Sequence, residues 1–369
     1  MFVGNSDQRL LINMSNENHL KIVYDLLKTL SILKLEKNMF NVDNLIIKDN
    51  DGMSYISEVI AQIDYGEIIE EKKPNVTEYI KQCDIYAKMK FFYDEWLSCK
   101  IYMDSLNMNN FISNDMIIFL KKMKYEKIIE SFYYLRYKDP KDHIRVRVKY
   151  DDKNLNILVK ELSNFIESLR NKYLINDFCI DTYFPEKSRY GGEKLFELSE
   201  ELFFYDSILV ADLLNFNEIN KNVYSIDELF ILSSLEILKN LQIDINELIG
   251  ILEPFSLLKF SQKNKKSLKE KIIGKMLSQQ KKDILYQDKK EDIDLYIIYS
   301  KVESFIKKYG EYLKDYEFEY KKDIVNSLIH MHHNRLVGIN RKKENYLMNV
   351  LESVIYSLNK RSIYHEVEK

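Results

Sequence analysis

The chain has 369 residues, of which 46% are hydrophobic and 31% charged, a composition typical of a soluble globular protein. Its 55 basic and 58 acidic side chains leave a formal charge of −3, so no overall positive field attracts nucleic acid. Three widely spaced cysteines without a C-x-x-C pair argue against disulfides and zinc ribbons. With no signal-peptide pattern and no membrane span in view, we expect a cytoplasmic protein.

Residues 1–92 mix short apolar runs with charge and contain no pattern typical of a catalytic site. Apolar residues at helical spacing predict a helix over 19–30, and Asn50-Asp51-Gly52 predicts a turn. Pro74 is expected to open another helix. We therefore divide the chain into an N-terminal extension of unknown role, residues 1–92, and a main domain, residues 93–369.

The most informative stretch is 132–150, which reads as two strands joined by a turn at 138–142. In the second strand apolar residues face one way, and the other face carries His143, Arg145 and Arg147. Guanidinium groups in a row suit bidentate capture of a carboxylate or phosphate. An ordinary amphipathic strand with solvated charges would show the same pattern.

Further strands are predicted at 96–103 and 178–184, with helices through 116–120 and over 155–172. Residues 208–320 read as mainly helical, with Pro254 ending one helix. A basic run over 259–275 is either a solvated helix face or a contact for an acidic partner. The predicted fold class is α+β, mainly helical, with a mixed or antiparallel sheet that carries the arginine-bearing hairpin.

A second stretch, 183–192, ends in Gly191-Gly192 between a strand and a helix, in a chain with only 9 glycines. Adjacent glycines indicate positive φ or a close approach. Arg189 precedes a helix start, where an anion could be held, although a solvated arginine beside a tight turn fits equally.

A third stretch, 323–338, contains three histidines, at 330, 332 and 333, and Gly338 is predicted to end its helix. On a helix, His330 and His333 share a face with Asn326 and Asn334. Histidine suits proton transfer near neutral pH. The spacing is not that of a metal site, and none is predicted.

Together these three stretches, over 136–147, 183–207 and 330–336, resemble the C-terminal domain of lantibiotic dehydratases, which also occurs alone in thiopeptide-type bacteriocin biosynthesis proteins. The resemblance runs from about residue 96 to about residue 359 and leaves residues 1–92 outside. It implies an enzyme, a lyase, that eliminates glutamate from O-glutamylated Ser or Thr of a ribosomal precursor peptide. The products are dehydroalanine or dehydrobutyrine.

The resemblance also implies partners and site residues. A separate tRNA-dependent dehydratase would glutamylate the peptide, and a homodimer is expected. No cofactor is required, and neither DNA binding nor a membrane span is expected. The family's glutamate-handling residues fall on Arg147, Arg189 and His330, with Arg145, His332 and His333 as the alternatives. Substrate-binding candidates beside them are Arg136, His143, Arg145, Glu186, Tyr190, Ser207, His333, Asn334 and Arg335.

Two other functions are compatible with the same stretches. Pyridine synthases of thiopeptide pathways, which join two dehydroalanines in a formal [4+2] cyclisation, look similar but depart from the glutamate-binding motif. A non-catalytic subunit that docks an acidic precursor peptide on the arginine face would have the same sequence features.

Overall fold

The computed structural model describes residues 2–5, 8–11, 16–29, 35–36, 95–172, 174–220, 223–281 and 290–367. The chain divides into two compact units, Met1–Lys72 and Lys73–Lys369. The predicted turn at 50–52 and the helix after Pro74 lie outside the described residues.

The first unit contains a small antiparallel sheet and one helix. Strand β1 (Phe2–Asn5) pairs with β2 (Gln8–Leu11) and with β3 (Leu35–Glu36). Helix α1 spans Glu17–Thr29, which confirms the helix predicted there.

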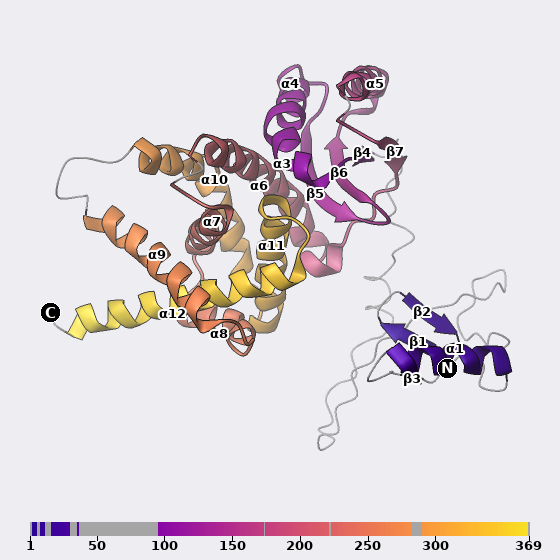
Figure 1. The fold of residues 1–369 in the computed structure, drawn as a ribbon. Coiled ribbons are helices and arrows are strands. Elements are labelled where there is room, and N and C mark those ends of the chain that lie inside the picture. Colours follow the sequence, from indigo (N-terminus) through magenta and orange to yellow (C-terminus); the bar gives the residue numbers. More distant parts are fainter. Residues whose placement is uncertain are drawn as a thin grey trace. The chain divides into compact units, whose positions relative to one another are not determined.

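The second unit is built on a four-stranded antiparallel sheet with the order β5-β6-β4-β7 (Figure 1). Its strands are β4 (Trp96–Tyr102), β5 (Ser131–Lys138), β6 (Asp142–Lys149) and β7 (Asp177–Asp181). Strands β5 and β6 are the two arms of a hairpin whose turn contains a cis Asp139–Pro140 bond. The last predicted strand ends at Asp181, three residues earlier than expected.

Two helices cover the apolar face of this sheet. The apolar face, with Val146 and Val148 of β6, packs under α4 (Ile117–Tyr125) and α5 (Leu155–Asn171). A short helix α3 (Met108–Asn110) and a π-helical turn, Phe111–Met116, lead into α4. In α5 the buried residues recur every three or four positions, which is the apolar stripe of a surface helix.

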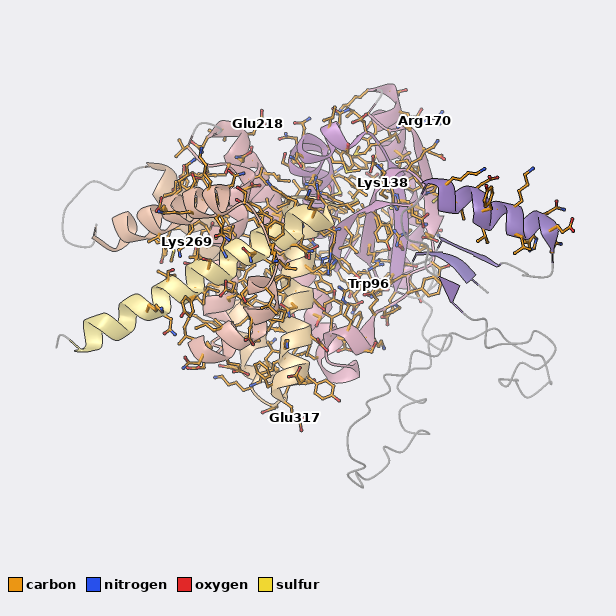
Figure 2. All side chains as sticks on the ribbon, turned by 60° about the horizontal axis from the view of Figure 1, so that its bottom comes forward. Trp96, Lys138, Arg170, Glu218, Lys269 and Glu317 are labelled. Carbon is orange, nitrogen blue, oxygen red and sulfur yellow. The ribbon has the colours of Figure 1, made fainter. Side chains whose placement is uncertain are left out.

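Seven α-helices follow β7 in the described part of the second unit (Figure 1), and their side chains fill the space between them (Figure 2). They are α6 (Glu193–Ile219), α7 (Ile226–Asn240), α8 (Ile245–Ser256), α9 (Gln262–Lys281), α10 (Lys290–Leu313), α11 (Phe318–Leu336) and α12 (Arg341–Val367). The protein is therefore mainly helical with an antiparallel sheet, as the sequence predicts.

Local sequence explains several helix ends. Ser225 and Glu228 form a capping box at the start of α7, and Gly338 has the positive φ expected after the end of α11. The prediction that Pro254 ends a helix is wrong, because α8 continues past it to Ser256. Within the described ranges, no helix has both the length and the apolar character needed to cross a membrane.

Candidate active site

A pocket of about 430 Å³ lies where the 3-10 helix Lys187–Tyr190 meets α11 and the start of α12. One wall is a single face of α11, because its pocket-lining polar residues follow the spacing i, i+3, i+4, i+7. These four residues are Asp323, Asn326, Ser327 and His330.

Arg189 enters this pocket from the 3-10 helix. Its Nε donates to Ser327 Oγ (3.1 Å) and its Nη1 to the carboxylate of Glu186 (3.1 Å). The turn that follows needs its two glycines, since Gly191 and Gly192 have φ of 81° and 76°. A Cβ on Gly191 would lie 3.0–3.1 Å from the Leu195 side chain. The glycine pair thus positions the 3-10 helix and Arg189 against α11.

His330 lines the same pocket and is paired with a carboxylate. Its Nδ1 lies 2.8 Å from Oε1 of Glu344, whose carboxylate also accepts from Arg341 (3.1 Å). Burial of Glu344 disfavours its charge, but the hydrogen bond to His330 and the nearby cations hold its pKa below the usual value. Glu344 is therefore ionised and orients the imidazole of His330 through Nδ1.

Arg147 does not line this pocket. Its Nη1 donates to Tyr133 Oη (2.8 Å), Tyr133 donates to Tyr183 (2.9 Å), and Tyr183 donates to Glu200 (2.5 Å). Burial raises the pKa of both tyrosines, so they are neutral hydrogen-bonding groups. The guanidinium also lies over the Tyr183 ring, at 4.3 Å. Arg147 is thus held in a fixed position, while its buried Nε has no hydrogen-bond partner.

Glu186 is ion-paired with Arg189. Burial disfavours the charge of Arg147, but Tyr133 and Tyr183, and to a smaller extent Glu186, raise its pKa. Arg189 is therefore the arginine that contacts a carboxylate directly.

The other residues of the cationic strand face are packed against their neighbours. Arg145 stacks on Tyr137 at 3.5 Å and donates from Nε to His143 Nε2 (3.2 Å). His143 is fully buried, with its Nδ1 2.8 Å from the carbonyl oxygen of Lys141. Burial lowers the pKa of His143, so it is a neutral imidazole. Neither side chain lines the pocket.

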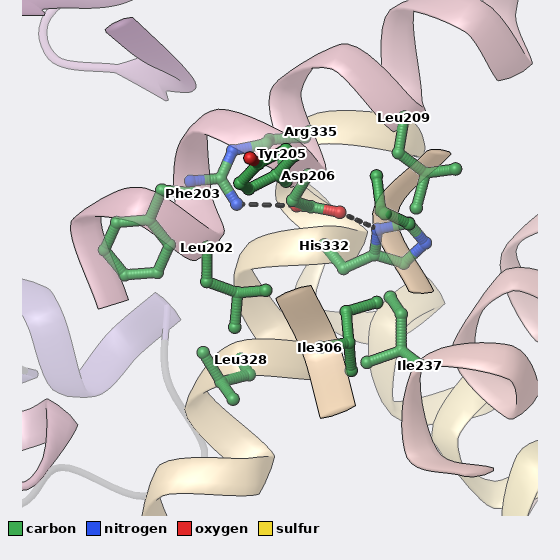
Figure 3. A pocket seen from close by; sticks show the side chains of 11 residues that line it. Leu202, Phe203, Tyr205, Asp206, Leu209, Ile237, Ile306, Leu328, His332 and Arg335 are labelled. Carbon is green, nitrogen blue, oxygen red and sulfur yellow. Dashed lines mark hydrogen bonds and ion pairs between the residues drawn. The ribbon is translucent and has the colours of Figure 1, made fainter. Parts of the chain in front are cut away.

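A second polar cluster lies inside the helical layer (Figure 3). His332 has Nδ1 2.6 Å from Asp206 and Nε2 2.6 Å from Ser233 Oγ, and Asp206 also accepts from Arg335 (2.7 Å). Ser233 and His332 are each 1% exposed, and the adjoining cavity measures only about 20 Å³. A substrate cannot enter a space of that size, so this Ser-His-Asp arrangement ties α6, α7 and α11 together.

Four more of the predicted site residues tie strand β5 to its helices. Asn334 bonds the backbone N–H and C=O of Arg136, both at 2.9 Å, and Arg335 donates to the carbonyl of Tyr134. Ser207 accepts from the N–H of Tyr134. These contacts satisfy the backbone groups of an edge strand from the side chains of α6 and α11.

The structure therefore brings together Arg189 and His330, with Glu186 beside them. Tyr190 is buried edge-on against Phe203, and His333 is buried against Phe230, so neither lines the pocket. Sequence reasoning missed Ser327 and Glu344. The spacing along α11 could have revealed Ser327, whereas no local signal links Glu344 to a histidine on the preceding helix.

Fold and pocket define an α+β protein in which Arg189 lines the same pocket as a carboxylate-paired histidine, His330. The chain belongs to the family described as lantibiotic biosynthesis dehydratase C-term, whose model matches residues 96–355.

Curated relatives align over most of the chain. The subtilin biosynthesis protein SpaB of Bacillus subtilis is 25% identical over 96% of this chain and 35% of its own length. The nisin biosynthesis protein NisB of Lactococcus lactis subsp. lactis is 26% identical over the same shares. The chain thus spans about a third of these relatives. Their alignments cover more of the chain than the family match does and extend to residues before 96.

A solved structure has the same fold. The tRNA-dependent lantibiotic dehydratase MibB from Microbispora sp. 107891 matches 98% of this chain and 36% of its own, with a TM-score of 0.64 and 16% identity.

Proposed function

We propose that this chain is the glutamate-elimination part of a split lantibiotic- or thiopeptide-type dehydratase and converts O-glutamylated Ser or Thr of a precursor peptide to dehydroalanine or dehydrobutyrine. The observation that carries the proposal is the shared pocket of Arg189 and His330, with Glu344 orienting the histidine. A separate tRNA-dependent glutamylating partner would supply the substrate.

The chemistry needs a base and a site for the leaving group. Nε2 of His330 takes the α-proton of the acylated residue, and Glu344 stabilises the resulting imidazolium. The electron pair of the broken Cα–H bond forms the second bond between Cα and Cβ. The electron pair of the breaking Cβ–O bond leaves with glutamate, on its α-carboxylate. Arg189 is the donor in the pocket that could bind a carboxylate of the glutamyl group.

Arg147 is the second arginine of the proposed site, although it does not line the pocket. Its hydrogen-bonded chain to Glu200 fixes the guanidinium, and its buried Nε–H lacks a partner. A substrate carboxylate that displaces Glu186 would bind Arg189, and Arg147 is the second arginine that we propose acts on it.

The test is a peptide carrying a chemically installed O-glutamyl serine, incubated with variants of the protein. Arg189→Ala or Arg147→Ala is expected to slow elimination about 100-fold or more, because each removes a charged donor from the site. Mass spectrometry would then find the glutamylated peptide intact. Arg170→Ala, an exposed arginine of α5 labelled in Figure 2, is the matched control and keeps the rate of the unchanged protein.

The same assay separates the rival functions. A pyridine synthase would leave the glutamylated peptide unchanged and alter the mass of a peptide that already contains two dehydroalanines. A binding subunit would alter neither. If the Arg147 and Arg189 variants dehydrate the glutamylated peptide at the normal rate, the roles given to them are wrong.

A further inference from the structure

The polar groups of the pocket are unequally satisfied. Arg189 is bonded to Ser327 and Glu186, and His330 and Arg341 share Glu344. Among the carboxylate and amide side chains of the α11 wall, two have an acceptor without a hydrogen bond in the described part of the chain.

One of these acceptors is the Asp323 carboxylate, which is exposed and forms no ion pair in the described part of the chain. The other is Oδ1 of Asn326, which is buried and has no hydrogen-bond partner. An unsatisfied buried acceptor costs about 1–3 kcal/mol, so it is a position where a donor from a ligand gains affinity.

These acceptors and the arginine lie one helical turn apart. Asp323 precedes Ser327, the residue that holds Arg189, by four positions, which is about 6 Å along the helix axis. Asn326 lies between them on the same face. The pocket therefore offers the Arg189 guanidinium and, within about one helical turn of it, two unfilled acceptors. A ligand that carries a carboxylate and a cationic donor a few bonds apart matches these groups.

We propose that Asp323 and Asn326 form an ammonium subsite that binds the free α-amino group of the glutamyl ester, while Arg189 binds its side-chain carboxylate. The inference rests on the proposed function for its ligand. Glutamate delivered by a tRNA is joined through its α-carboxyl, so the ester keeps a free amine and a free side-chain carboxylate. These two opposite charges match the two ends of the pocket.

The experiment measures binding to the full chain, with no turnover. L-Isoglutamine carries the free amine, the side-chain carboxylate and a neutral α-carbonyl, as the ester does. Glutaric acid monoamide is the same molecule without the amine. Titration calorimetry or ligand-observed NMR should give an affinity about fivefold higher for L-isoglutamine, since one partly solvated charge contact contributes on this scale.

Variants assign the preference to the subsite. Asp323→Asn and Asn326→Leu should bring the two affinities close together by weakening L-isoglutamine alone. Glu319→Gln is the matched control, because Glu319 is an exposed acidic residue of α11 outside the pocket, and it keeps the preference.

Equal affinities for the two amides, or no binding of L-isoglutamine, would overturn the subsite. The elimination assay decides the proposed function separately. If the chain prefers L-isoglutamine but eliminates no glutamate, the subsite is supported and the proposed lyase activity is wrong. If it eliminates glutamate without that preference, the lyase activity is supported and the subsite is wrong.

Discussion

His333 is a buried histidine of α11. It is 1% exposed, its Nε2 has no hydrogen-bond partner, and burial lowers its pKa to about 4. At neutral pH the side chain is therefore uncharged and packs between α11 and Phe230. Its chemistry is separate from that of His330, which faces the pocket three residues earlier.

A loss of stability in mild acid follows from this pKa. In the unfolded chain the pKa of a histidine is about 6.5, so between pH 6.5 and 4 the unfolded state binds the proton more tightly. The contribution of His333 is fully present above pH 6.5 and is lost as the pH falls. At pH 5 the loss amounts to about 2 kcal/mol in the free energy of unfolding.

Urea unfolding at pH 7 and pH 5 measures this loss. The expected result is that His333→Gln, which cannot be protonated, flattens the pH dependence of the unfolding free energy by about 2 kcal/mol. His143 has a lowered pKa as well, so part of the slope remains in the variant. An unchanged slope in His333→Gln would contradict the assigned pKa.

At this scale the sequence could identify residue types but not their partners. Helical geometry correctly indicates that positions 330 and 333 are neighbours. However, they differ by about 60° of rotation about the helix axis. The edge of the packed face falls between them, so His330 faces the pocket and His333 is buried. Arg147 and Arg145 alternate with apolar residues as predicted. Their aromatic partners, Tyr183 and Tyr137, come from other strands and from the loop after β7, so the packing could not be read locally.

Helix α11 is the element on which the second unit depends. Its polar residues serve three purposes: the pocket face, the backbone of β5, and the buried cluster with Asp206. Arg335 is 1% exposed and has one carboxylate partner among the described residues, Asp206 of α6. Burial disfavours the charge of Asp206, but His332 and Arg335 hold its pKa below the usual value.

Asp206→Asn should therefore destabilise the fold strongly. It leaves a buried guanidinium without a counter-charge, which costs about 3–5 kcal/mol. The measurement is the midpoint of urea unfolding at neutral pH. Asp212→Asn, on the same helix, loses only ion pairs to the partly exposed Lys121 and Lys301 and should cost no more than about 1 kcal/mol. Similar midpoints for the two variants would show that the buried pair stabilises the fold no more than the partly exposed pairs do.

Element positions were predictable where local pattern decides them. The hairpin follows from alternation around Pro140, and α5 follows from its apolar stripe. Pro254 misleads because a proline in the third-last position of a helix loses one hydrogen bond near an end that frays anyway. The π-helical turn at 111–116 has no recognised sequence signal and could not be predicted.

For the whole molecule, the sequence predicts a division near residue 92, and the buried core gives a physical reason to test it. The apolar core cluster draws its buried residues from Trp96 to Ile355, all in the second unit. The family match covers the same stretch, 96–355. A unit that buries its own apolar residues has the main driving force for independent folding.

We expect the chain from residue 93 to residue 369 to fold without residues 1–92. Scanning calorimetry should give one cooperative transition with a midpoint within about 3 °C of the corresponding transition of the full chain. A chain that begins at residue 104 is the control. It lacks β4, which pairs with β6 on one side and β7 on the other, so the sheet loses its inner strand and the cooperative transition should disappear. If the 93–369 chain also fails to unfold cooperatively, the first 92 residues are part of the folding unit, and the domain division is wrong.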